Sequence, residues 1–427
     1  MRYQISDLPG LLTSAQGRRS LLMGQISRLY PLFRFLAGQY RRHFLKKTCV
    51  IAVIGSLGKT TTAKTAAVIA GDLKLDNMRN ADYAVILNLL KYSAKDRHAV
   101  MEVGIERPGQ MVLHARMIRP DIVIVTSIAS EHILSFKNLD GVREEKVAMV
   151  REIPKNGTVI LNADDPNVMW MASQTNASIV TYGINNDADV RAVNIKNNFP
   201  HGMTFEVPAE REIHKCSIRF LGRHMVYPAL AALALARARK LDFTNACRSL
   251  SEIIPADSRM QAVPLESGAI IIRDDFKSTR ESIWAALDTL EECAGKRKIV
   301  ILGAASEITN DIRYSFHREL GQRIAETADS VYVINRKENF RSIRQGASKA
   351  GMEETRLTRV EGTPLSVIPL LPQDLGEGDV ILIKGRTNQR LARISLALTG
   401  KKVGCRIPYC KTRKYFCDSC PWLESGP

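Results

Sequence analysis

A glycine-rich segment with one lysine and three threonines carries the strongest chemical signal in the sequence. It reads Gly55-Ser-Leu-Gly58-Lys-Thr-Thr-Thr62. Glycines allow backbone N–H groups to approach phosphate oxygens closely, and a helix that starts at such a loop adds a favourable dipole. The lysine of such a loop reaches the β- and γ-phosphates, and the next hydroxyl binds Mg²⁺. The predicted phosphate-binding residues are Gly55, Ser56, Gly58, Lys59, Thr60 and Thr61.

Four cysteines near the C-terminus form a second group of chemically active residues. They are Cys405, Cys410, Cys417 and Cys420. Two pairs of thiols joined by a short loop can surround a tetrahedral Zn²⁺, although spacings of four and six residues are uncommon in such sites. An iron–sulfur cluster and free or redox-active thiols are the alternatives. Aromatic and basic residues interleave with these cysteines, which leaves single-stranded nucleic acid as a weaker hypothesis.

The elements that must position the phosphate loop follow an α/β pattern. The run CVIAVIG before the loop is typical of a strand buried on both faces. Similar runs recur at 99–104, 121–128, 158–162 and 177–183, with helical stretches between several of them. This alternation predicts a parallel sheet covered by helices, and the pattern after residue 184 predicts an antiparallel addition.

A second α/β series starts near Arg259 and predicts a smaller Rossmann-like domain. The sequence thus divides into a basic helical segment, a central domain, a C-terminal domain and a Cys-rich basic tail. Their predicted ranges are 1–46, 47–256, 257–400 and 401–427.

The N-terminal segment predicts one long helix over residues 16–46, with Pro31 kinking or breaking it. Apolar residues recur every three or four positions and define one face: Leu22, Ile26, Leu29, Phe33, Leu36, Tyr40 and Phe44. This face either packs on the body of the protein, with the basic residues in solvent, or holds a membrane surface or an acidic carrier.

The 427 residues have a formal net charge of +17, and most of it lies at the two ends. Residues 1–47 contain nine Lys or Arg and one Asp, whereas residues 401–427 contain six Lys or Arg and two acids. A nearly neutral body disfavours nucleic acid as a partner. With 45% hydrophobic residues and no apolar run of transmembrane length, the chain is expected to be globular, cytoplasmic and at most peripheral to a membrane.

Several blocks, in order, resemble the Mur ligase superfamily, which also includes folylpolyglutamate synthases. GSLGKTTT resembles its shortened phosphate loop, and MEVGIERPGQ (101–110) resembles its Glu-x-Gly block. RPDIVIVTSIASEH (119–132), GVREEKVAMVRE (141–152) and NGTVILNADDPNV (156–168) resemble the blocks that follow. The resemblance covers residues 47 to 400. It implies an α/β fold, with a P-loop, parallel-sheet central ATPase domain followed by a smaller Rossmann-like domain.

The resemblance also implies roles for individual residues. Mg²⁺ ligands would be Thr60, Glu102, His132 and Lys146, the last carbamoylated by CO₂ so that it offers an anionic oxygen. In the second domain, Arg259 would reach the nucleotide phosphates and Asp275 would orient the nucleotide. The implied catalytic residues are Lys59, His132, Lys146 and Lys277.

Three substitutions and a short N-terminus depart from the family pattern. Met225 and Pro228 replace two asparagines, of which the second normally reads adenine, and Arg386 replaces a serine near substrate. The residues before position 47 are too few for the UDP-binding domain of ligases that act on UDP-muramoyl substrates. We therefore expect no binding of UDP-muramoyl peptides.

The predicted function is ATP-dependent ligation of a carboxylate to an amine or amino acid, through an acyl phosphate, with ADP and phosphate as products. Two alternatives remain: a glutamate ligase of the folylpolyglutamate synthase type, and a non-catalytic or partner-dependent binding protein. The chain's block at 273–282 differs from that of folylpolyglutamate synthases, and Met225, Pro228 and Arg386 motivate the second alternative.

Overall fold

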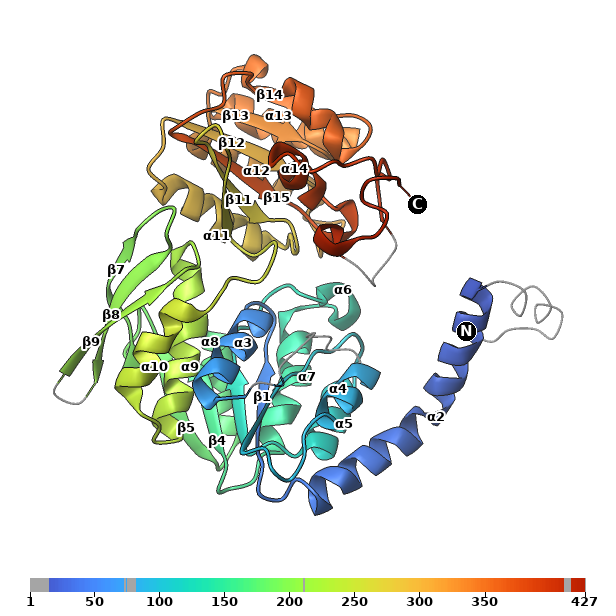
Figure 1. The fold of residues 1–427 in the computed structure, drawn as a ribbon, viewed down its shortest axis with the longest axis vertical. Coiled ribbons are helices and arrows are strands. Elements are labelled where there is room, and N and C mark those ends of the chain that lie inside the picture. Colours follow the sequence, from blue (N-terminus) through green and yellow to red (C-terminus); the bar gives the residue numbers. More distant parts are fainter. Residues whose placement is uncertain (1–14, 73, 75–81, 210–211, 411–415, 427) are drawn as a thin grey trace.

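Two mainly parallel sheets form the computed structural model, which describes residues 15–72, 74, 82–209, 212–410 and 416–426 (Figure 1). Each sheet is covered by helices on both faces, so the α/β class predicted from the sequence is confirmed. None of the helices in this described part combines the length and apolar character needed to cross a membrane.

The first sheet has the strand order β2-β1-β3-β4-β5-β6, and every neighbouring pair is parallel. Its strands are β1 (Cys49–Ile54), β2 (His98–Glu102), β3 (Ile122–Val125), β4 (Thr158–Asn162), β5 (Ser178–Gly183) and β6 (Val190–Arg191). Strand β1 lies between β2 and β3, so the chain moves to one side of β1 to form β2 and then crosses to its other side to form β3. Ligands of such sheets bind at this switch point, outside the carboxyl ends of the strands.

Helices cover the two faces of this sheet with separate apolar cores. On one face lie α3 (Lys59–Ala70) and α9 (Val226–Ala238), which pack against each other. On the other face lie α4 (Asp82–Leu89), α5 (Gln110–Ile118) and α7 (Leu139–Arg151). Shorter helices are α6 (Ile133–Phe136), α8 (Pro166–Met169) and α10 (Phe243–Ser249). All six residues of β1 are buried, as its uninterrupted apolar sequence predicts.

The expected antiparallel addition is a three-stranded sheet: β7 (Val193–Asn197), β8 (Met203–Ala209) and β9 (Glu212–Ile218). Its buried side joins the apolar core under α3 and α9. Cys49, Cys216, Cys247 and Cys293 are buried in this protein.

The second sheet has the order β10-β11-β15-β12-β13-β14, in which only β10 runs antiparallel to its neighbour. Its strands are β10 (Gln261–Pro264), β11 (Ile270–Asp274), β12 (Arg297–Leu302), β13 (Ser330–Val333), β14 (Leu357–Arg359) and β15 (Asp379–Lys384). Its helices are α11 (Arg280–Glu292), α12 (Arg313–Thr327), α13 (Lys337–Lys349) and α14 (Ala392–Leu398). Single turns of 3-10 helix are η2 (Trp170–Gln174), η3 (Arg223–Met225), η4 (Leu250–Glu252), η5 (Glu354–Arg356), η6 (Pro364–Leu370), η7 (Thr387–Gln389) and η8 (Cys417–Ser419).

Helix α2 (Ala15–His43) projects from the first domain, and its C-terminal half, from Tyr30 onward, contacts α4 and α5 (Figure 1). Arg41 anchors this half, with Nε donating to the carbonyl of Ile118 at 2.9 Å and Nη2 lying 2.8 Å from the Asp121 carboxylate. The helix continues through Pro31, so the predicted break is wrong. Pro31 and the two residues after it are exposed, so the ring does not clash with a packed neighbour of the helix.

Most of the apolar face predicted for this helix does not pack on the body, although Tyr40 does, with its hydroxyl donating to the Tyr92 carbonyl at 2.8 Å. Leu29, Phe33, Leu36 and Phe44 are 41–63% exposed. The contact with the body is made instead by a neighbouring stripe, in which Ala37 is 1% exposed. The side chains of Leu22 and Ile26 lie outside the described residues.

Candidate active site

The phosphate loop lies at the carboxyl end of β1, where helix α3 begins, as predicted. Gly55 has φ 134°, and a Cβ there would lie 2.0 Å from the Thr126 hydroxyl oxygen. Gly58 precedes the helix with φ 80°. Only glycine adopts such conformations without strain, so both positions are fixed by backbone geometry. The loop is tied to the next strand because the Ser56 N–H donates to the Ser127 carbonyl at 2.7 Å.

Lys59 is buried beneath this loop. Its Nζ donates to the carbonyls of Gly55 and Ser56, each at 2.8 Å, and lies 2.5 Å from an oxygen of Glu131. Burial lowers the pKa of Lys59 to about 8, although the nearby Glu102 carboxylate opposes the shift. An ammonium held here without water binds an anion strongly.

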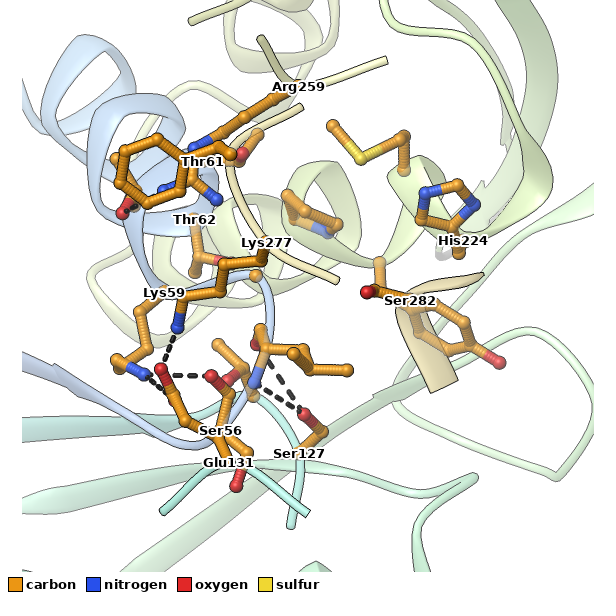
Figure 2. Close-up of a pocket in the computed structure, with 18 of the residues that line it drawn as sticks. Ser56, Lys59, Thr61, Thr62, Ser127, Glu131, His224, Arg259, Lys277 and Ser282 are labelled. Carbon is orange, nitrogen blue, oxygen red and sulfur yellow. Dashed lines mark hydrogen bonds and ion pairs between the residues drawn. The ribbon is translucent and has the colours of Figure 1, made fainter. Parts of the chain in front are cut away.

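Glu131 is the principal residue that sequence reasoning missed. Its carboxylate, 6% exposed, also forms an ion pair with Lys277 from the second domain (Figure 2). One buried carboxylate therefore joins the lysine of the phosphate loop to a lysine of the other domain. Its place next to His132, inside a block already singled out, was the only signal in the sequence.

The residues expected to hold Mg²⁺ lie near the loop, but they differ in their contacts with it. The Thr60 hydroxyl donates to Glu102 at 2.9 Å, at the end of β2. His132 has φ 63° and its Nε2 lies 3.8 Å from a Glu131 oxygen; burial lowers the pKa of its ring. Lys146 is buried against the loop, and its Nζ donates to the Gly55 carbonyl at 2.5 Å.

The second domain contributes residues that close over the loop. Arg259 Nη2 donates to the Thr60 hydroxyl at 3.2 Å, and its guanidinium lies over the Phe276 ring at 4.2 Å. Ser130 of the first domain donates through its hydroxyl and its N–H to Glu281 of α11, at 2.7 and 3.1 Å. These contacts bring the predicted residues Lys59, Thr60, Arg259 and Lys277 together.

Asp275 does not lie in the cavity wall, where the sequence placed it. It is 4% exposed, one of its oxygens is 3.8 Å from Arg273 Nε, and burial raises the pKa of its carboxyl. Its neighbour Asp274 takes the place at the cavity and pairs with Lys384. Successive side chains of an extended chain point to opposite sides, so Asp274 and Asp275 point in opposite directions and only Asp274 faces the cavity.

The space between the two domains is a cavity of about 840 Å³. Figure 2 shows Lys59, Glu131, Lys277, Arg259 and His224 around it. Pro228 and Met225 also line it, at the positions where the family has asparagines. The volume fits a drug-sized or nucleotide-sized ligand.

The cysteine tail does not form the predicted metal site in this structure. Within the described residues, no three His, Cys, Asp or Glu side chains lie close enough together to hold a metal ion. All four tail cysteines are free, and Cys417 is buried while the other three are partly exposed. The structure therefore gives the zinc hypothesis no support.

Family models match both domains. A model described as the Mur ligase middle domain matches residues 47–236, and one described as the Mur ligase, glutamate ligase domain, matches residues 258–387. The chain therefore belongs to the Mur ligase family, a class of ATP-dependent, amide-forming ligases.

Curated relatives and solved structures agree with this class. The UDP-N-acetylmuramoyl-tripeptide--D-alanyl-D-alanine ligase of Bacillus subtilis strain 168 is 26% identical over 353 residues, 81% of this chain and 75% of that relative. MurF from Acinetobacter baumannii has a TM-score of 0.77 at 23% identity, covering 87% of this chain and 81% of that one. A MurF ligase from Thermotoga maritima, in complex with ADP, has a TM-score of 0.75 at 19% identity and covers 87% and 84%. The solved structures share the fold.

Proposed function

We propose that this protein joins the carboxylate of a peptide to the amine of an amino acid or dipeptide at the expense of ATP. The carboxylate oxygen attacks the γ-phosphorus and ADP leaves; the amine then attacks the acyl phosphate, releasing inorganic phosphate and one proton. The observation that carries this proposal is a pair of lysines, the buried Lys59 and the partly exposed Lys277, which both pair with the buried Glu131 from two domains. Phosphoryl transfer is limited by charge, and cations held without water stabilise it most.

Each named residue has a proposed task in this reaction. Backbone N–H groups from Gly55 to Thr61 cradle the phosphates, with Lys59 at the β- and γ-phosphates. Arg259 and Lys277 approach from the second domain, so binding of the nucleotide draws the domains together and excludes water. Asp275, buried beside Arg273, acts on the nucleotide only through neighbouring residues.

The loop also fits a magnesium ion. Thr60 and Glu102 offer the oxygen ligands that Mg²⁺ prefers, 2.9 Å from each other, and His132 lines the same cavity. When bound, the metal neutralises charge on the phosphates. Lys146 fits the role of a carbamate because burial lowers the pKa of its amine well below the ordinary value, and the neutral amine is the form that reacts with CO₂.

The relatives suggest the substrates. Their names describe a UDP-linked muramoyl tripeptide and D-alanyl-D-alanine. We propose a peptide carboxylate and a dipeptide or amino acid amine for this chain.

The test is phosphate release from ATP with D-alanyl-D-alanine and either a UDP-muramoyl tripeptide or the same peptide without UDP. Release that requires both carboxylate and amine supports the ligase. Release with glutamate and a folate-like acceptor would assign the second alternative. Nucleotide binding without any acceptor-dependent release across the series would favour a binding protein and overturn the ligase.

A second function, docking to a membrane, is favoured by the exposed face of α2. We propose that Leu29, Leu32, Phe33, Leu36 and Phe44, each 41–63% exposed, insert into an anionic lipid surface. Helix α2 contains no acidic residue, and the first 47 residues carry a strong positive charge, which complements anionic headgroups.

The membrane proposal is tested with vesicles of phosphatidylcholine alone and with added phosphatidylglycerol. The full chain should sediment only with the anionic vesicles, less at high salt, and the variant Phe33→Asp/Leu36→Asp should not. Leu87→Asp, an exposed residue of α4, is the control. Equal binding of both variants to the anionic vesicles would overturn the proposal. A dimer of the full chain that Phe33→Asp/Leu36→Asp dissociates and Leu87→Asp does not would also overturn it, and would assign the face to a second copy of the chain.

A further inference from the structure

The described parts of the C-terminal tail, residues 401–410 and 416–426, are held against the second domain by two buried arginines. Arg393 of α14, 1% exposed, donates to the carbonyls of Cys405 at 3.0 Å and Ile407 at 2.6 Å. Arg273 of β11, 4% exposed, donates two hydrogen bonds to Asp418, at 2.7 and 3.1 Å. In Figure 1 the dark red tail lies beside α14. The tail is therefore a docked part of the fold.

Cys417 adds an apolar anchor between the two arginines. It is 9% exposed and packs in a small cluster with Ala392 and Leu396 of α14. Burial raises the pKa of its thiol to about 12. Such a thiol is inert, so we assign it packing and not reactivity.

This docking places one residue of the tail in the wall of the cavity. Phe416, which directly precedes Cys417, lines the cavity and remains 47% exposed. The ring centroids of Phe416 and Phe276 are 5.9 Å apart, and the guanidinium of Arg390 lies 5.9 Å from the centroid of the Phe416 ring. The matched family models end at residue 387, so neither of them includes this wall.

The contact continues from the tail to the phosphate loop. Phe276, next to Lys277, has Phe416 as one neighbour and the Arg259 guanidinium over its ring at 4.2 Å. Arg259 in turn donates to the hydroxyl of Thr60. Aromatic pairs and cation–π contacts each restrict where the partner can lie. Phe416 thus limits how far Phe276 and Arg259 can move from the loop.

We propose that Phe416 and Asp418 of the tail are positioning residues of the nucleotide site, acting through Phe276 and Arg273. Phe416 holds Phe276 beneath Arg259, and Asp418 holds Arg273 beside Asp275. This inference rests on the proposed nucleotide site, but not on which carboxylate or amine the protein uses. It makes the tail a part of the active site that lies beyond the matched family models.

The experiment is calorimetric binding of a non-hydrolysable ATP analogue with Mg²⁺ to full-length variants, since it needs no knowledge of the other substrates. Phe416→Ala should raise the Kd roughly three- to tenfold, because a ring contact and the cation–π contact it supports are lost. Phe416→Tyr should restore near-normal binding. Tyr409→Ala, a half-exposed aromatic of the same tail, is the matched control and should bind normally.

A double-mutant cycle separates positioning from general damage to the fold. Arg259→Ala should weaken binding on its own, and adding Phe416→Ala to it should have little further effect, because the tail acts through Arg259. Asp418→Asn keeps the shape of the side chain and should weaken binding in the same direction, with an unchanged melting temperature.

Two outcomes contradict the inference. Normal analogue binding by both Phe416→Ala and Asp418→Asn, with Arg259→Ala impaired, would overturn the role of the tail alone. Normal binding by Arg259→Ala as well would overturn the nucleotide site on which the inference rests.

Discussion

The two walls of the cavity are held in place by different means. The wall from the first domain comes from the carboxyl ends of β1, β2 and β3, whose register is fixed by parallel pairing. The wall from the second domain also has strand ends, at Asp274 of β11 and Lys384 of β15, but its place against the first wall depends on side-chain contacts between distant segments, such as Ser130 with Glu281. The phosphate loop is therefore fixed by its own backbone, whereas the position of the second wall relative to the loop is only as fixed as these side-chain pairs are.

The difference predicts where substitutions do most harm. Loss of a charge in the first wall removes a group that the backbone holds ready for phosphate, and nothing can move in to replace it. Loss of a contact in the second wall changes where its side chains lie relative to the phosphate loop. The loss of binding or activity should therefore be partial. Four predictions test this contrast.

The largest effect is expected for Lys59→Ala. ATP turnover should fall by about a thousandfold or more, since the positive charge at the β- and γ-phosphates is lost. The fold should persist, because Glu131 keeps Lys277 as its partner. Steady-state kinetics and circular dichroism measure the two quantities, with the exposed Lys95→Ala as control. Near-normal turnover in Lys59→Ala would refute the phosphate-loop assignment.

The next effect is expected for Lys146→Ala, which should lower turnover by about a hundredfold or more if the proposed carbamate supplies an oxygen ligand to the metal. Short carboxylic acids in solution should restore part of the activity by supplying that oxygen. The same acids should not affect Lys137→Ala, an exposed lysine just before α7. A high-resolution structure of active protein grown with bicarbonate and showing an unmodified Lys146 would contradict the carbamate.

The sequence predicted the first wall better than the second, for a physical reason. Strand β1, the loop glycines and the start of α3 at Lys59 are local features, written in consecutive residues. Glu131 and Phe416 matter through partners that are distant in the sequence, Lys59 and Lys277 for Glu131 and Phe276 for Phe416, and no local pattern signals such contacts.

Local causes explain three differences between the sequence pattern and the structure. The resemblance assigns Asp275 to the nucleotide, whereas Asp274 is the residue that lines the cavity, since neighbouring side chains along the chain point in opposite directions. The apolar face of α2 was correctly located, yet periodicity alone cannot say whether a face meets the protein or remains exposed. Pro31 did not break the helix because its surroundings are solvent-exposed.

A third prediction concerns His224, which lies where the two walls meet, with Asp274 and Lys384 of the second domain nearby. Burial lowers the pKa of its ring to about 4, and Lys384 adds to the shift. The unfolded chain, with a histidine pKa near 6.5, takes up a proton first as the pH falls, so folding stability is lost below that value. At pH 5 this loss amounts to about 2 kcal/mol.

The measurement is the free energy of unfolding by urea at pH 7 and pH 5, for the protein and for His224→Asn. The variant should lose less stability on acidification than the parent, because it lacks this titrating group. Equal losses of unfolding free energy in both proteins would show that protonation of His224 does not contribute to the acid sensitivity of the fold.

The smallest effect, and the most direct test of the contrast, is expected for Glu131→Gln. Glu131 is the common counter-ion of Lys59 and Lys277, so phosphates that bind at these two lysines must displace it from both. Removing its charge should therefore tighten binding of a non-hydrolysable ATP analogue roughly fivefold, about 1 kcal/mol. The gain in analogue affinity should be smaller in a Lys277→Ala background, where Lys59 is the remaining lysine of the two that pairs with Glu131. A gain of the same size in both backgrounds would mean that the walls bind phosphate independently. Weaker binding by Glu131→Gln alone would instead make Glu131 part of the nucleotide or metal site, and the second wall would then be as firmly fixed as the first.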